Sequence, residues 1–164
     1  MKRNMSAAVG ATLLVATLGA SATAATSTSA ALRCPGATRA ATASRIDGAW
    51  RRDIPRAAWI KAGLSALDWE TNGGRHTLTF DHGVWYDHDD VVGTPPDACG
   101  PYTLKAGVLT GAQTTIGGTS VPKRAIFKVR ATRSGDTLRL VPLPLATSDP
   151  VGRYTFSGTW RKLG

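Results

Sequence analysis

The stretch RHTLTFDHGVWYDHDD, residues 75–90, contains all three histidines of this 164-residue chain and indicates its fold class. Two runs, HTLTF and VWYDH, are rich in residues that favour strands, and they flank the polar segment Asp81-His82-Gly83. Two or three residues with a glycine between such runs are typical of a β-hairpin. The stretch therefore predicts two antiparallel strands joined by a tight turn.

The length of that turn decides which side chains share a face. A three-residue turn with glycine in its third position places His76 opposite His88, close enough for both to approach one ion. The face that holds both histidines is then the inner one, and it also holds Leu78, Phe80, Val84 and Tyr86. A two-residue His82-Gly83 turn instead places His76 opposite Asp89. The sequence leaves both registers open.

Strand-like runs separated by glycine-containing turns continue to the C-terminus. Three-residue turns are expected at 105–107 and 133–135, and a last strand is expected at 152–163. In the run RAIFKVRAT, residues 124–132, period-2 alternation separates two kinds of side chain. One face holds Phe127, Val129 and Ala131, and the other holds Lys128 and Arg130.

The first strand is expected over residues 46–54, followed by a short helix that begins at Pro55 and ends at Gly63. A second helical turn is expected around DWETN, residues 68–72. The spacing of strands and turns predicts a mainly β protein with one short helix after the first strand. Its antiparallel sheet is either closed into a barrel or folded into a sandwich.

Residues 1–24 have the features of a secretory signal peptide. Lys2 and Arg3 precede an apolar run, and a small-residue cleavage pattern ends at Ala24. The apolar run is too short for a transmembrane segment, so a secreted protein is expected. Residues 25–45 are rich in Ala, Ser and Thr and are expected to form a flexible tail, whereas residues 46–164 form the domain.

The chain has two cysteines, Cys34 and Cys99. In an oxidising compartment this even pair is most simply one disulfide, which would tie the tail to the domain. The formal net charge is +9, but no run of Lys or Arg is present. This pattern does not indicate a nucleic-acid partner, and we expect a monomer.

The sequence contains no established catalytic motif. A G-x-S-x-G elbow and a phosphate-binding glycine loop are absent, and Glu70 is the only glutamate. Two imidazoles fall short of the three protein ligands of a catalytic zinc site. We therefore predict no catalytic residue, no metal and no cofactor.

The segment Gly48-Ala49-Trp50 resembles the G-x-W motif that opens lipocalins and related calycin barrels. The final GTWRKLG, residues 158–164, resembles the last strand of that group, whose arginine packs across the first tryptophan. Over 46–164 the chain is similar to a largely uncharacterised, secreted lipocalin-like module of high-GC Gram-positive bacteria. The resemblance implies a small antiparallel lipocalin-like β-barrel, with structural roles for Trp50, Trp160 and Arg161.

Three functions follow as hypotheses. The first is a secreted binding protein for a small apolar ligand, held in the barrel mouth by His76, Phe80, Tyr86, His88, Tyr102 and Phe127. The second is a filled-barrel interaction module for an extracellular protein or cell-wall partner, with the loop 89–98 as its best feature. The third is a calycin-type isomerase or cyclase that uses His88 as a general base. An empty apolar interior favours the carrier, and a packed one favours the interaction module.

Overall fold

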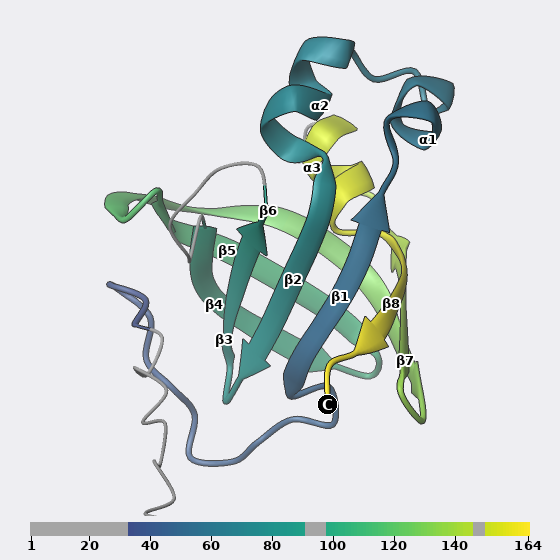
Figure 1. Ribbon diagram of the computed structural model, residues 1–164. Helices are drawn as coiled ribbons and strands as arrows, with labels where there is room; N and C mark the ends of the chain where they lie inside the picture. The colour runs from purple at the N-terminus through teal and green to yellow at the C-terminus, as the bar shows by residue number, and fades with distance from the viewer. Residues whose placement is uncertain (1–32, 91–97, 146–149) are drawn as a thin grey trace, which may run out of the picture. The chain divides into compact units, whose positions relative to one another are not determined.

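The computed structural model describes residues 33–90, 98–145 and 150–164, which form a closed antiparallel β-barrel (Figure 1). Each strand pairs with the next one along the chain, and the last strand pairs back with the first. The strands are β1 (Gly48–Ile54), β2 (Gly74–Asp81), β3 (Val84–Asp89), β4 (Ala98–Lys105), β5 (Val108–Ile116), β6 (Thr119–Ser134), β7 (Thr137–Pro142) and β8 (Gly158–Lys162). The predicted mainly β, antiparallel fold is confirmed, and the barrel is the arrangement that the structure has.

Short helices gather at one end of this barrel (Figure 1). Helices α1 (Arg56–Lys61) and α2 (Ala66–Asn72) follow β1, and α3 (Pro150–Thr155) precedes β8. The Ser65 hydroxyl caps α2 by accepting a hydrogen bond of 3.0 Å from the backbone N–H of Asp68. None of the helices in the described residues is long and apolar enough to span a membrane.

The predicted strand over 152–163 is wrong in its first half, because residues 152–155 belong to α3 and residues 156–157 connect α3 to β8. The Arg52 guanidinium donates hydrogen bonds to the carbonyls of Tyr154, at 2.8 Å, and Ser157, at 2.5 Å. A cation at the C-terminus of a helix satisfies carbonyls that have no partner within the helix. Gly158, with φ 82°, then turns the chain into β8.

The turns explain the observed registers. His82 (φ 48°) and Gly83 (φ 85°) form a two-residue turn, and Ala106 (φ 46°) and Gly107 (φ 77°) form another. The three-residue turns expected at both places, and at 133–135, are therefore wrong. At the histidine hairpin the alternative register is confirmed, since His76 pairs with Asp89.

A slip of one residue moves every side chain of a strand to the other face. Trp85 consequently points into the barrel, whereas Tyr86 and His88 lie on its outer side. The predicted inner positions of Val84, Tyr86 and His88 are wrong for this reason.

In the part of the chain that the structure describes, aromatic and aliphatic side chains pack across the barrel interior. Rings from different strands meet inside the barrel: Trp85 of β3 and Phe127 of β6 have centroids 5.4 Å apart. Phe156, directly after α3, stacks on Phe127 at 4.6 Å. Gly111 allows this packing, because a Cβ there would collide with the Phe127 ring. The buried core comprises Ile46, Trp50, Leu78, Phe80, Trp85, Tyr102, Leu109, Phe127, Val129, Ala131, Leu138, Leu140, Phe156 and Trp160.

Residues 33–45, which we call the strap, begin on the outer side of β3, β4 and β5 and then pass beneath the barrel to the start of β1 (Figure 1). The predicted disulfide between Cys34 and Cys99 is present and fixes the strap to β4. The Pro35 carbonyl accepts a hydrogen bond of 2.9 Å from the Thr114 hydroxyl of β5. The strap thus covers a small outer apolar cluster of Cys34, Ala37, Val84, Tyr86 and Cys99.

The signal peptide predicted over residues 1–24 lies outside the described residues, and so do residues 25–32 of the expected tail. The predicted domain boundary at Ile46 stays a prediction.

The other end of the barrel, away from the helices, is closed by Ile46 and Trp50, both fully buried. The cation over the Trp50 ring is Arg133, whose guanidinium carbon lies 5.4 Å from the ring centroid. Arg161 was expected there, but it is exposed on the outer side of β8, opposite Arg51. Trp160, for which a structural role is predicted, is fully buried in the core.

Candidate functional site

The structure separates the six residues predicted to bind a ligand. Phe80, Tyr102 and Phe127 lie in the packed core, where Phe80 and Tyr102 meet edge to face with centroids 5.1 Å apart. His76 is also inside, but toward the helical end. Tyr86 and His88 lie on the outer side of β3. The predicted residues therefore do not converge on one point.

His76 belongs to a polar cluster on the inner side of β2 and β3. Its Nε2 lies 2.9 Å from the carbonyl oxygen of Asn72 at the end of α2, and its Nδ1 lies 3.3 Å from a carboxylate oxygen of Asp87. A carbonyl oxygen only accepts, so Nε2 carries a proton. Burial alone would lower the pKa of His76, but hydrogen bonds to Asp87 and Asn72 and the charge of Asp89 together raise it. The cluster is a buried, charged link between α2 and the barrel wall.

A second group, Asp47, Asp81 and His82, lies at the β2–β3 turn. Each offers one ligand atom, and these atoms lie within 4.8 Å of one another. Such a spacing is compatible with a cation, yet the oxygens already have partners. Asp81 forms an ion pair of 2.7 Å with Arg39 of the strap.

The Asp47 carboxylate accepts hydrogen bonds from the hydroxyls of Ser44 and Tyr102, both at 2.5 Å, and from the His82 backbone N–H at 2.8 Å. Burial alone would raise the pKa of Asp47, but these hydrogen bonds outweigh it and lower the pKa. Burial and the bond to Asp47 raise the pKa of Tyr102 to about 12. The group fastens the strap to the barrel, which is a structural role.

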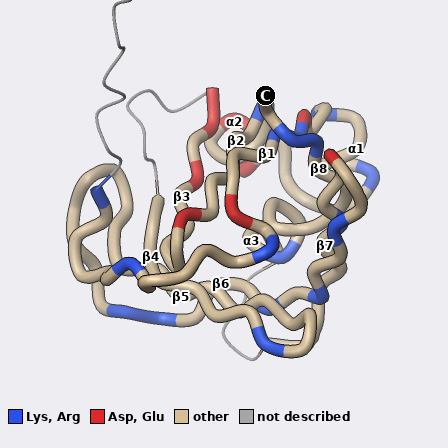
Figure 2. Tube along the Cα trace, turned by 90° about the horizontal axis from the view of Figure 1, so that it is seen from below, with Lys and Arg blue, Asp and Glu red and all other residues tan. Residues whose placement is uncertain are grey.

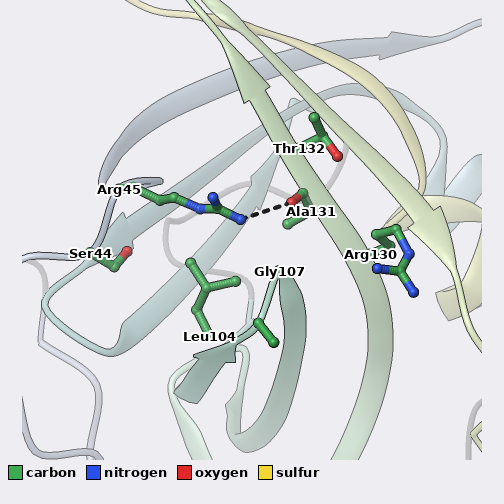
Figure 3. A pocket seen from close by; sticks show the side chains of 8 residues that line it. Ser44, Arg45, Leu104, Gly107, Arg130, Ala131 and Thr132 are labelled. Carbon is green, nitrogen blue, oxygen red and sulfur yellow. Dashed lines mark hydrogen bonds between the residues drawn. The ribbon is translucent and has the colours of Figure 1, made fainter.

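An open pocket of about 730 Å³ lies beside this group (Figure 3). Arg45 reaches across it to the carbonyl oxygen of Ala131, at 3.5 Å, and Arg130 lies on the other side. The pocket is lined by Ser44, Arg45, Leu104, Ala106, Gly107, Arg130, Ala131 and Thr132. The described residues that line the hollow include two guanidinium groups and no carboxylate, which favours an anion over an apolar ligand.

A second open pocket, of about 290 Å³, lies at the helical end between the α1–α2 connection and α3. Its lining is Ala62, Leu64, Pro142, Pro150, Arg153, Tyr154 and Ser157. None of the six predicted ligand-binding residues lines either pocket.

Arg130 also belongs to a set of basic residues on the outer side of β6, β7, β8 and β1. We call this set the basic stripe: Lys128, Arg130, Arg139, Arg161 and Arg51, all exposed. Figure 2 shows blue segments along β7 and β8 and red segments on β2 and β3. In the described residues from Ala98 onward, ten are Lys or Arg and Asp136 is the only acidic one.

The sequence revealed part of this set. The alternation in residues 124–132 correctly placed Lys128 and Arg130 opposite the apolar face. Their neighbours Arg139, Arg161 and Arg51 come from three other strands, so they join the set only through the barrel registers.

No family model, curated protein or solved structure matches this chain.

Proposed function

We propose that the protein is a secreted, lipocalin-like interaction module that binds its partner through its outer surface. The observation that carries this proposal is the filled interior. Trp85 and Phe127 meet across the barrel, and Phe156 contacts both rings with centroids 5.4 and 4.6 Å away. An internal ligand would have to displace these rings, and deletion of such a ring costs about 3–5 kcal/mol.

The expected export signal and the disulfide both support the extracellular setting, because disulfides persist in oxidising compartments. The alternative of an enzyme with His88 as a general base requires that side chain inside the barrel mouth. Its outer position on β3 gives that alternative no support.

The test is whether the interior accepts an apolar molecule. Protein purified from culture medium is analysed by native mass spectrometry with a denatured control, and is then titrated with indole. We expect a bare polypeptide without saturable indole binding, whereas the matched variant Trp85→Ala binds indole in the space it opens. Phe127→Ala is the second variant if Trp85→Ala does not fold. A co-purifying apolar mass, or saturable indole binding by the unmodified protein, would favour the carrier and overturn the proposal.

A further inference from the structure

The basic stripe has a regular geometry that follows from the strand registers. Arg130 on β6 lies opposite Val141 of β7, and Arg139 is two residues along β7 from Val141. Arg139 lies opposite Thr159 of β8, and Arg161 is two residues along β8 from Thr159. The basic residues thus step diagonally across the wall, one strand at a time. Diagonal neighbours on a sheet are about 7–8 Å apart.

Two of the arginines face each other directly. Arg51 of β1 and Arg161 of β8 are cross-strand partners. Like charges in that position are destabilising, and acidic neighbours normally offset them. In the part of the chain that the structure describes, no ion pair involves any member of the basic stripe. Among the described residues, the repulsion between Arg51 and Arg161 is therefore left without a counter-charge.

Threonine hydroxyls lie between the cations. Thr132 pairs with Arg139, which pairs with Thr159, and Thr137 pairs with Arg161. Guanidinium groups bind oxyanions through parallel N–H donors, and hydroxyls add further hydrogen bonds. The surface is complementary to a series of oxyanions spaced along a chain.

We infer that the basic stripe binds a linear extracellular polyanion whose repeats carry phosphate or sulfate groups and no aromatic base. This inference rests on the proposed function, since it names the partner of the outer surface. Val141 is a large apolar residue that is exposed on the outer side of β6–β8, with 42% of its surface accessible. The outward positions on the described strands β6–β8 that surround the stripe hold Thr, Ser and Val rather than aromatic rings. Binding of single-stranded nucleic acid ordinarily uses such rings to stack bases. The open pocket at Arg130 and Arg45 continues the positive surface beyond one end of the stripe.

The experiment measures the affinity of the whole protein for fluorescently labelled linear polyphosphate as a function of salt. A triple variant, Arg130→Ser, Arg139→Ser and Arg161→Ser, is compared with a control triple at the helical end, Arg56→Ser, Lys61→Ser and Arg153→Ser. Both lose the same net charge. We expect the stripe triple to lose at least about 30-fold in affinity and the salt dependence of log K to flatten by about 2 units. The control should stay within about threefold, as expected for charges that do not contact the polymer.

Absence of polyphosphate binding at low salt overturns the inference. An equal loss of polyphosphate affinity in the stripe triple and the control triple also overturns it. Tighter, stripe-dependent binding to double-stranded DNA or to vesicles of anionic lipid overturns the assigned polymer class.

If the stripe triple does not fold, the double variant Arg130→Ser, Arg139→Ser takes its place. Indole titration of the same samples separates the two proposals. Indole binding contradicts the outer-surface module itself, whereas loss of polyphosphate binding with an indole-free interior contradicts the stripe alone.

Discussion

Two walls of the barrel differ in which face carries their charged side chains. One wall is formed by β2 and β3, and the other by β6, β7 and β8. The first holds His76, Asp87 and Asp89 on its inner side, and the strap contacts its outer side. The second is apolar inside and carries the basic stripe outside. In the first wall every charge discussed has a partner within the chain, whereas in the second the cations have none in the described residues. The difference separates charges that hold the fold from charges that are available to a partner.

The largest effect should come from releasing the strap from its wall. The double variant Cys34→Ser, Cys99→Ser opens a loop between cysteines 65 residues apart, which should lower the free energy of unfolding by about 4 kcal/mol. Urea unfolding of the oxidised protein and the variant measures this difference. A change below about 1 kcal/mol would mean that the strap adds little, and the contrast between the walls would fail.

The inner ion pair should have the next largest effect. His76→Leu leaves Asp87 buried without its cation, and breaking such a pair costs about 3 kcal/mol. Because the folded pKa of His76 is raised, its contribution is complete below the unfolded pKa of about 6.5 and is lost as pH rises through the folded value. The difference in free energy of unfolding between the unmodified protein and the variant should be smaller at pH 9 than at pH 6. A gap that grows with pH contradicts a protonated His76, and Thr77→Ala on the outer side of β2 is the matched control.

Tyr102→Phe should have a smaller effect. It removes one hydrogen bond to the Asp47 carboxylate, worth about 1.5 kcal/mol. Since the folded pKa of Asp47 is lowered, its contribution is present above about pH 3.9 and is lost as pH falls through the folded value. The variant should therefore lose less stability than the unmodified protein on acidification from pH 5 to below pH 3. Ultraviolet titration should also show one of the three tyrosines ionising near 12, and this step should be missing in the variant.

Substitution in the basic stripe should have the smallest effect on stability. Arg139→Ser removes a charge that makes no ion pair in the described residues, so the free energy of unfolding should stay within about 0.5 kcal/mol. Arg161→Thr also relieves the repulsion with Arg51 and should be neutral or slightly stabilising. A clear destabilisation in urea unfolding would show that these cations hold the fold, and the two walls would then not differ.

Much of the fold could be predicted from the sequence, because alternation and glycine turns are local signals. Most of the strands, the disulfide and the opposite faces of Phe127 and Lys128 follow from neighbouring residues or simple counting. The histidine hairpin shows where local signals end. A histidine with φ 48° in a two-residue turn is uncommon, so the sequence favoured a three-residue turn. That choice assigned Trp85 to the outer face and Tyr86 to the inner face, the opposite of what the structure has.

The candidate site was harder to predict because it is not local. Arg139, Arg161 and Arg51 become neighbours only when β7, β8 and β1 pair in the observed registers. Helix α3 depends on Arg52, about one hundred residues earlier in the chain, whose guanidinium bonds to Tyr154 across a separation of 102. No local pattern in residues 150–157 signals that contact.

The seam of the barrel has a consequence for how the protein folds. Seven of the strand pairings join consecutive strands, but β1 and β8 come from opposite ends of the domain and share two register pairs, Trp50 with Lys162 and Arg51 with Arg161. Contacts so distant in sequence form slowly, because the intervening chain must be ordered first. The hairpins should assemble early as a meander, and closure at the seam should be the late, rate-limiting event. Local opening should begin at the same place, which would separate β8 from β1 while the long β5–β6 ladder is still intact.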